Sequence, residues 1–229
     1  MLTVILAESS LERIPKTLIG HSLIKRDAKR RHKTPEQLLL DRSYHHRAMM
    51  NLPYSERRGR PDIVHVTLLT SLGSPLNLMG QLRLFIHTHE DLVIEVSPKL
   101  RIPRNSERFK GLMEQLYENH CISVAGIPLL ELQEMTLHQL TRKIVPTRTV
   151  GLTVQGEETK LESLAISLAK QERPVVVIGG FPRGHFSEKT MKLLDKTVRI
   201  YPSGLEAWTV ASWAIFAYEQ AAGLRKLIS

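Results

Sequence analysis

The sequence predicts an α/β fold in which a mostly parallel sheet carries helices on both faces. Two observations support this fold class. Strand-like and helix-like segments alternate in the last third of the chain, and the segment "PVVVIGG" (174–180) is apolar almost throughout. Strands that are apolar on both faces are typical of parallel sheets between two helix layers. The length of 229 residues and the hydrophobic fraction of 42% suit one domain with an insertion.

The N-terminal region is expected to begin with a strand and to continue into a basic segment. "MLTVILAESS" (1–10) is apolar and shows neither a basic leader nor a small-residue cleavage site, so we interpret it as a strand rather than a signal peptide. The segment "IKRDAKRRHK" (24–33) is a dense basic run. Thr34 and Pro35 are residue types that favour a helix cap and a first helical position, which predicts a helix from there to about Met50.

The middle of the chain combines strand and helix patterns. "DIVHVTLLTSL" (62–72) is apolar and rich in β-branched residues, and we expect a buried strand there. Residues 82–88 and 92–98 flank a short polar turn and predict a hairpin. Residues 105–119 have helical spacing, and residues 126–140 are interpreted as a turn followed by a short helix.

The last third supplies the alternation on which the fold class rests. Strands are expected at 149–155, 174–180 and 197–201, and helices at 157–170 and 204–227.

The charge balance favours a polyanionic partner. Lys and Arg number 32 against 23 Asp and Glu, which gives a net charge of +9, and the isoelectric point is about 9.8. Clustered cations attract phosphates and release counterions on binding, so a nucleic acid is the favoured partner class. No uninterrupted apolar run is long enough to predict a transmembrane helix. The single cysteine, Cys121, excludes intramolecular disulfides and a cysteine-rich zinc site, and we expect it to be a small buried residue.

Two glycine-containing turns follow predicted strands and are candidates for a ligand pocket. In "VVVIGGFPRGHF" (175–186), Gly179 and Gly184 have the spacing of a phosphate-binding loop. His185 and Phe186, however, stand where such a loop requires Lys and Ser or Thr, which argues against a nucleotide triphosphatase. The turn in "RIYPSGLEAW" (199–208) is the second candidate, and together the two turns suit an adenine site lined by backbone. Taken alone, each is equally compatible with an ordinary glycine turn.

Arginines gather in two further segments. In "RRGRPDIVH" (57–65), three arginines precede an apolar segment, and Arg57 and Arg58 are interpreted as a solvated or phosphate-steering pair. Arg101, Arg104 and Arg108 lie in a loop that enters a helix, and the last two share a helical face if that helix begins early. A solvated basic face is the alternative for these three.

Other clusters have weaker signals. His87 and His89 alternate on a predicted strand but have no third ligand at a suitable spacing, so no metal site is predicted. A stripe of apolar side chains in the C-terminal helix is interpreted as core or subunit interface: Trp208, Val210, Trp213 and Phe216.

Four segments together carry a family resemblance: "RRGRPDIVHVTLLTSLGSPLN", "LVIEVSPKLRIPRNSERFKGLMEQL", "VVVIGGFPRGHF" and "RIYPSGLEAW". They resemble the ribosome-biogenesis pseudouridine methyltransferases of archaea and eukaryotes, a family of the SPOUT superfamily, and the resemblance covers nearly the whole chain. It implies S-adenosylmethionine as methyl donor, a homodimer and a C-terminal trefoil knot. It also implies a single domain over 1–229, a basic insertion at about 21–60 and a knot region at about 148–229.

The implied reaction is methylation of the ring nitrogen at position one of a specific pseudouridine in small-subunit ribosomal RNA. The implied setting is cytoplasmic and without a membrane, with ribosomal proteins as further partners. An RNA-binding ribosome-assembly factor, in which methyl transfer is secondary or absent, is the alternative because the same arginines serve both roles.

The resemblance also implies roles for individual residues. Arg60 matches the substrate arginine, and Asp62 matches the carboxylate that holds it, with general base as the alternative role for Asp62. Arg101, Arg104 and Arg108 match the arginines that contact RNA. The implied cofactor-binding residues are Leu152, Gly179, Gly184, Val198, Arg199, Ile200, Tyr201, Pro202, Ser203 and Leu205.

Overall fold

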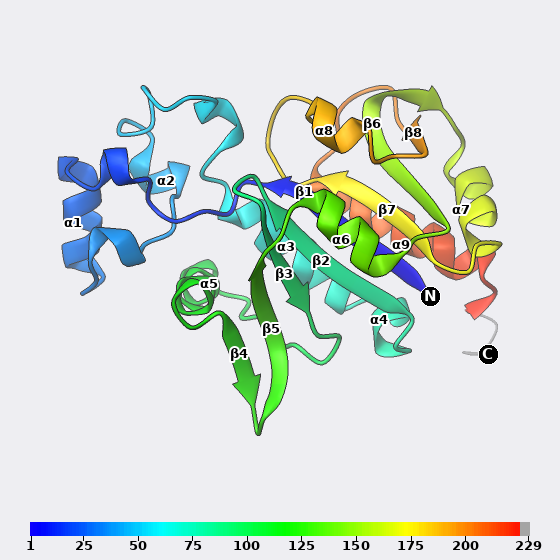
Figure 1. The fold of residues 1–229 in the computed structure, drawn as a ribbon, viewed down its shortest axis with the longest axis horizontal. Coiled ribbons are helices and arrows are strands. Elements are labelled where there is room, and N and C mark those ends of the chain that lie inside the picture. The colour runs from blue at the N-terminus through cyan, green and yellow to red at the C-terminus, as the bar shows by residue number, and fades with distance from the viewer. Residues whose placement is uncertain (225–229) are drawn as a thin grey trace.

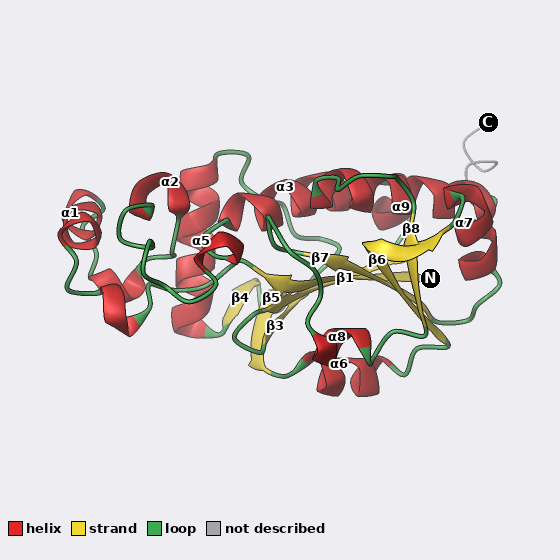
Figure 2. Cartoon of the chain, turned by 90° about the horizontal axis from the view of Figure 1, so that it is seen from above, coloured by secondary structure: helices red, strands yellow, loops and turns green. Residues whose placement is uncertain are grey.

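The structure is a computed structural model that describes residues 1–224, and it has an eight-stranded sheet with helices on both faces (Figures 1 and 2). The strand order is β4-β5-β3-β2-β1-β7-β6-β8. The strands are β1 (Leu2–Ser9), β2 (Leu82–Thr88), β3 (Leu92–Val96), β4 (Cys121–Val124), β5 (Ile127–Glu134), β6 (Arg148–Glu158), β7 (Pro174–Gly179) and β8 (Lys196–Arg199).

The α-helices are α1 (Ser22–Arg30), α2 (Arg42–His45), α3 (Pro61–Leu72), α4 (Pro75–Leu78), α5 (Ser106–Asn119), α6 (Leu137–Ile144), α7 (Leu161–Ala169), α8 (Glu188–Met191) and α9 (Ala207–Ala221). Short 3-10 turns occupy Lys16–Leu18, Pro35–Gln37 and Ser55–Arg57. Figure 2 shows α3, α7 and α9 on one side of the sheet and α6 and α8 on the other.

The sheet is mixed but mostly parallel, as the sequence predicted. β2, β1, β7, β6 and β8 are paired in parallel, whereas β3, β5 and β4 extend the β2 edge with antiparallel pairing. The apolar run of β7 is buried on both faces of the sheet. Val176 and Ile178 belong to the core cluster that contains side chains of α3 and α9, whereas Val175 and Val177 belong to the cluster beneath α6. Because strand side chains alternate between faces, a strand between two helix layers must be apolar at every position.

The segment expected as a buried strand at 62–72 is a helix instead. α3 covers Pro61–Leu72, with Pro61 at its first position and Asp62 in its first turn. It packs against α9 in the main core, and the Thr67 hydroxyl donates to the Ile63 carbonyl 2.7 Å away within the helix. A helix buried on most of its surface is apolar nearly all round, so periodicity cannot separate it from a buried strand. Proline at the first helical position and a length of 12 residues were the signals for a helix.

The continuous helix expected from Thr34 to about Met50 is instead broken into a 3-10 turn at Pro35–Gln37 and the short α2 at Arg42–His45. Gln37 does cap the expected start, since its Oε1 accepts from the Thr34 amide at 2.9 Å. The helical turn nevertheless ends at once, because residues 38–40 are all leucines and all buried. The chain runs extended there and pairs with residues 12–14, so that Ile14 donates to the Leu38 carbonyl at 2.9 Å. Leu38 and Leu40 pack in a small separate cluster and Leu39 packs in the main core, an alternation that extended backbone produces and a helix does not.

The region between β1 and α3 has its own small apolar cluster, which includes Ile24, Leu38, Leu40 and Met49. The basic run at 24–33 lies mostly in α1, at the edge of the molecule away from β6 and β8 (Figure 1).

The remaining expectations for single elements have mixed outcomes. The 82–98 hairpin, the helix at 105–119 and the alternating elements of the last third are present as β2–β3, α5, β6, α7, β7, β8 and α9. The last expected residues of the C-terminal helix, 225–227, lie outside the described residues. Residues 121–134 form the β4–β5 hairpin, which we did not predict, and Cys121 is exposed at its edge rather than buried. Among the described helices, none has the length and apolarity needed to cross a membrane.

Candidate functional site

A pocket of about 260 Å³ lies beside β6 and beyond the ends of β7 and β8. Three segments line it: residues 152–154 of β6, the loop 178–186 after β7, and residues 199–210 between β8 and the first turns of α9. Ligands of open α/β sheets bind beyond the carboxyl ends of strands, which is where this pocket lies.

Most of the residues that the resemblance implied for the cofactor meet in this pocket. Val198 does not line it; its side chain is 1% exposed and packs in the main core. Pro202 is also absent from the lining. The implied residues that do line the pocket are Leu152, Gly179, Gly184, Arg199, Ile200, Tyr201, Ser203 and Leu205.

The pocket combines apolar walls with exposed backbone. Leu152, Ile178 and Val210 contribute apolar side chains, whereas Gly179 and Gly184 offer only backbone to a ligand. Pockets that pair apolar walls with a few polar groups suit an aromatic ligand that also forms directional hydrogen bonds.

Two of the glycines cannot be replaced without strain. Gly184 has a φ of +96°, a backbone conformation that L residues rarely adopt. A Cβ on Gly179 would lie 2.8 Å from the ring of Phe181. Gly184 therefore requires glycine to keep the loop in this shape, and a side chain at Gly179 would displace the ring of Phe181.

Aromatic residues of the glycine loop are pocket residues that sequence reasoning missed. Phe181 and Phe186 both line the pocket, and their rings meet edge to face with centroids 6.0 Å apart. Phe186 was used only to exclude a phosphate loop. The available signal was the placement of two aromatic rings within a glycine-rich loop that follows a buried strand.

Arg60 and Asp62 form a two-pronged ion pair at the start of α3. Arg60 Nε donates to Asp62 Oδ1 at 2.8 Å, and Nη2 donates to Oδ2 at 2.7 Å. The hydrogen bond to Asp62 is the main cause of the raised pKa of Arg60. Glu206 also acts electrostatically on Arg60 and directly follows Leu205 of the pocket lining. The pair therefore lies within electrostatic reach of the pocket segment 199–210. It stands at the start of a helix and not of the expected strand.

The guanidinium of Arg60 is both fixed and accessible. Its side chain is 31% exposed, so one side remains open to solvent. Asp62 lies in the first turn of α3, where the positive end of the helix dipole favours a carboxylate.

Arg101, Arg104 and Arg108 are exposed around the start of α5. α5 begins at Ser106, and the Asn105 side chain caps it by accepting from the Arg108 amide at 3.0 Å. Arg104 precedes the cap, so it does not share a helical face with Arg108 as the sequence had suggested.

His65 was missed by sequence reasoning, although it connects α3 to this arginine loop. Its Nε2 donates to the Pro103 carbonyl at 2.7 Å, and its ring stacks on Phe109 with centroids 4.4 Å apart. Nothing in its own sequence neighbourhood indicates these partners, which lie about 40 residues further along the chain.

Arg57 and Arg58 are not the solvated pair that the sequence suggested. Arg57 Nη2 donates to Glu8 Oε2 at 2.6 Å. Arg58 holds the fully buried Glu12 with Nε at 3.0 and 3.1 Å from the two carboxylate oxygens. Burial alone would raise the pKa of Glu12, but hydrogen bonds from His89 and Arg58 outweigh it and lower that pKa.

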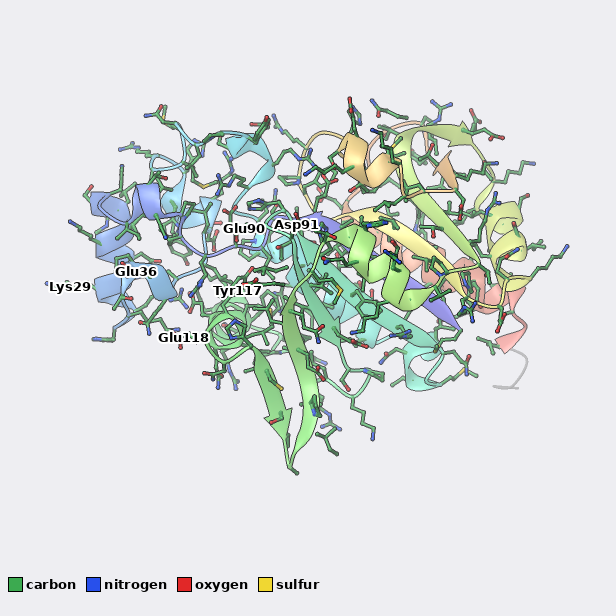
Figure 3. All side chains as sticks on the ribbon, in the orientation of Figure 1. Lys29, Glu36, Glu90, Asp91, Tyr117 and Glu118 are labelled. Atoms are coloured by element: carbon green, nitrogen blue, oxygen red, sulfur yellow. The ribbon has the colours of Figure 1, made fainter. Side chains whose placement is uncertain are left out.

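The two histidines considered as a metal pair have separate partners. His87 Nε2 lies 3.0 Å from Asp91 Oδ1, and His89 Nε2 lies 3.0 Å from Glu12 Oε1. Within residues 1–224, one set of potential ligands clusters closely enough for a metal ion, namely Glu12, His89 and Glu90. The Arg58 guanidinium already neutralises Glu12 there. Figure 3 shows Glu90 and Asp91 close together near the centre of the molecule.

Part of the expected apolar stripe on α9 is exposed. Trp208 and Val210 pack against the main core, whereas Trp213 is 39% and Phe216 is 49% exposed. These two, with Ile166 of α7 and Ile200, line a broad apolar hollow.

Comparison with known proteins gives a consistent family match. A family model described as "EMG1/NEP1 methyltransferase" matches residues 4–219. A protein of Thermococcus onnurineus named "Ribosomal RNA small subunit methyltransferase Nep1" is 43% identical over 219 residues, which cover 96% of this chain and 98% of that protein. A protein of the same name from Pyrobaculum islandicum is 44% identical over 224 residues, covering 96% and 99%.

A solved structure agrees with these sequence matches. The crystal structure of Archaeoglobus fulgidus Nep1 bound to S-adenosylhomocysteine superposes with a TM-score of 0.86 and is 35% identical in sequence. The match covers 96% of this chain and 98% of that one.

Proposed function

The chain belongs to the EMG1/NEP1 methyltransferase family, and from this premise we propose that it methylates the ring nitrogen at position one of a specific pseudouridine in small-subunit ribosomal RNA. The names of the curated relatives support small-subunit ribosomal RNA as the substrate class. The assignment of S-adenosylmethionine as cofactor rests on the S-adenosylhomocysteine bound to the similar Archaeoglobus fulgidus structure. The choice of pseudouridine and of its nitrogen rests on the resemblance of the sequence motifs.

The pocket residues fit S-adenosylmethionine. Leu152, Ile178 and Val210 would offer apolar side chains to the adenine, and the segment 199–205 would offer it backbone donors and acceptors. When bound, S-adenosylmethionine supplies an electrophilic methyl group on a sulfonium whose leaving group is a neutral thioether. The protein's part is then to hold the accepting nitrogen in line with that methyl group at near-attack distance.

Arg60 is the residue that we propose orients the target nucleotide. The nitrogen becomes nucleophilic only as it loses its proton to solvent water, and a guanidinium that donates to a neighbouring carbonyl oxygen stabilises the resulting anion. Asp62 uses both carboxylate oxygens to hold Arg60. This geometry supports a positioning role for Asp62 rather than that of a general base.

The exposed cations around α5 and α1 support RNA as the partner. Arg101, Arg104 and Arg108 are exposed, and no carboxylate of a described residue lies within ion-pairing distance of them. On α1 the same holds for the exposed Lys25 and Lys29. Figure 3 shows Lys29 at the outer edge of the molecule, well away from the sheet.

The proposal also covers the domain organisation, the oligomeric state and the cellular setting. We infer a single domain over 1–229 with a basic insertion at about 21–60 and a trefoil knot within about 148–229. The convergence of three C-terminal segments on one pocket supports the knot. The exposed Trp213 and Phe216 support a homodimer that covers them. A cytoplasmic setting and ribosomal-protein partners rest on the resemblance alone.

Methyl transfer to matched RNA hairpins tests the activity. One hairpin carries pseudouridine at the target position and the other carries uridine, and each is incubated with the protein and S-adenosylmethionine. We expect the intact mass of the first to increase by one methyl group and that of the second to stay unchanged. RNA binding without any mass gain would contradict the activity and favour the ribosome-assembly factor.

A further inference from the structure

Residues 7–10, at the end of β1, form hydrogen bonds both with the pocket loop that follows β7 and with the segment 57–60 that carries Arg60. On one side, Gly180 donates its amide to the Ala7 carbonyl at 2.8 Å, and Ser10 donates to the Gly180 carbonyl at 2.9 Å. On the other side, the Arg60 amide donates to the Ser10 carbonyl at 3.2 Å, and the Ser10 hydroxyl donates to the Arg57 carbonyl. Residues 7–10 therefore touch both the pocket loop and the segment that carries Arg60.

Glu8 binds the residues that follow the pocket loop, Ser187 and Thr190. Its Oε1 accepts from the Ser187 amide at 2.9 Å, the Ser187 hydroxyl at 2.7 Å and the Thr190 hydroxyl at 2.6 Å. Burial alone would raise the pKa of Glu8, but these bonds and the charge of Arg57 outweigh it and lower that pKa. Glu8 therefore stays ionised and keeps accepting these hydrogen bonds. Its φ of +52° is uncommon for a residue with a side chain, and such strain concentrates at functional positions.

Arg57 extends from the segment that carries Arg60 to the middle of the pocket loop after β7. Its guanidinium carbon lies 4.0 Å from the ring centroid of Phe181, a pocket-lining residue. The same guanidinium donates to Glu8 at 2.6 Å, which fixes its position over the ring. The aliphatic part of Arg57 also passes within 3.7 Å of where a Cβ of Gly184 would be.

We propose that Arg57, held by Glu8, is a positioning residue that fixes Phe181 and with it the loop 180–187 in the shape that binds S-adenosylmethionine. This inference rests on the proposed function, since it assumes that the pocket holds this cofactor. Arg57 touches neither the methyl donor nor the RNA in the proposed roles. It acts through Phe181 on the loop 180–187, whereas the segment that carries Arg60 is held by the hydrogen bonds of Ser10, which do not involve the Arg57 side chain.

The affinity for S-adenosylhomocysteine, measured by isothermal titration calorimetry, tests the inference. Arg57→Ala removes both the ion pair and the stacking, and we expect its Kd to rise about five- to tenfold, the size of one partly buried cation–π contact. Arg57→Lys keeps a cation for Glu8 but lacks the planar group over Phe181, so it should fall between the wild type and Arg57→Ala. Affinity for an RNA hairpin should change less than twofold in both variants.

Arg83 offers a matched control on the opposite half of the sheet. Its guanidinium lies 5.0 Å from the Phe85 ring centroid and pairs with Glu95 at 3.3 Å. Arg83→Ala thus removes the same two kinds of interaction away from the pocket, and we expect its cofactor affinity to match that of the wild type.

Four results would decide the matter. Equal cofactor affinities of wild type and Arg57→Ala, or an equal loss in Arg83→Ala, would overturn the inference. If Arg57→Ala does not fold, an Arg57→Lys variant with unchanged affinity would overturn it as well. Absence of binding to the wild-type protein would instead contradict the proposed function, so the two failures are distinguishable.

Discussion

The imidazole of His65 joins helix α3 to the arginine loop, because its Nε2 donates to the Pro103 carbonyl at 2.7 Å. α3 begins with the residues that carry the Arg60–Asp62 pair, and Pro103 lies between Arg101 and Arg104. One buried side chain thus sets the position of three exposed arginines relative to the residue that is proposed to orient the target nucleotide.

Removal of the loop arginines should weaken RNA binding in a salt-dependent way. Arg101→Ala, Arg104→Ala and Arg108→Ala each delete one exposed cation, so the slope of log K against log salt should become shallower by about 0.7 to 0.9 for each phosphate that the variant no longer neutralises. Fluorescence anisotropy with a labelled hairpin at several salt concentrations measures this slope. Arg142→Ala on α6 is an exposed control and should leave it unchanged. Losses that are independent of salt would show that the three arginines are structural.

Asp62→Asn should impair positioning without a change in acid–base behaviour. Asparagine retains one acceptor oxygen, but its amide group faces the guanidinium, so Arg60 loses one of its two bonds. We expect weaker RNA binding together with slower methyl transfer, and a pH–rate profile of unchanged shape. Intact RNA affinity with lost transfer and an altered profile would assign the general-base role to Asp62.

Gly184→Val should abolish cofactor binding while the protein stays folded. The φ of +96° disfavours any L residue there, and relaxation of that strain would move the pocket loop. Gly80 is a matched control: its φ is +67°, a Cβ there would meet open space, and it lies outside the pocket. Gly80→Val should therefore cost stability but leave calorimetric affinity for S-adenosylhomocysteine intact. An unchanged affinity in Gly184→Val would refute the pocket assignment.

Stability should fall as the pH drops below the ordinary histidine value. Burial lowers the pKa of His45 below 6.5, although Asp27 and Asp41 act in the opposite direction and Lys110 reinforces the shift. The unfolded chain therefore takes up this proton first, and the favourable contribution present above pH 6.5 is lost as the pH falls toward the folded-state pKa. His87 is shifted the same way.

Denaturant unfolding at pH 7.5 and 5.5 measures this effect. His45→Gln should reduce the difference in unfolding free energy between the two pH values, whereas the exposed control His138→Gln should not. A wild-type difference retained in His45→Gln would place its origin elsewhere.

The fold class was accessible from the sequence, but the identity of single buried elements was not. β7 and α3 are both apolar segments without a polar face, and we interpreted both as strands. The difference lies in their partners: β7 is paired on both edges by β1 and β6, whereas α3 packs against α9. Tertiary packing decides such cases, and no periodicity within the segment reports it.

A similar limit applied to the site. The Arg60–Asp62 pair lies within a segment that carries the family resemblance, and it was the resemblance that implied it. Arg57 and Arg58 find Glu8 and Glu12 across 49 and 46 residues, and their charges therefore looked unpaired in the sequence. The pairing of the two glycine-containing turns in one pocket, by contrast, was predicted from the sequence, and the strand order explains it because β7 and β8 both flank β6.

The most direct test of the central claim is the identity of the modified nucleoside. After reaction with S-adenosylmethionine, the pseudouridine hairpin is digested to nucleosides, which are separated and compared by mass spectrometry with standards methylated at each ring nitrogen. The account predicts a single new nucleoside that coincides with pseudouridine methylated at ring position one. A methyl group at the other ring nitrogen, on a ribose or on another nucleotide would contradict it.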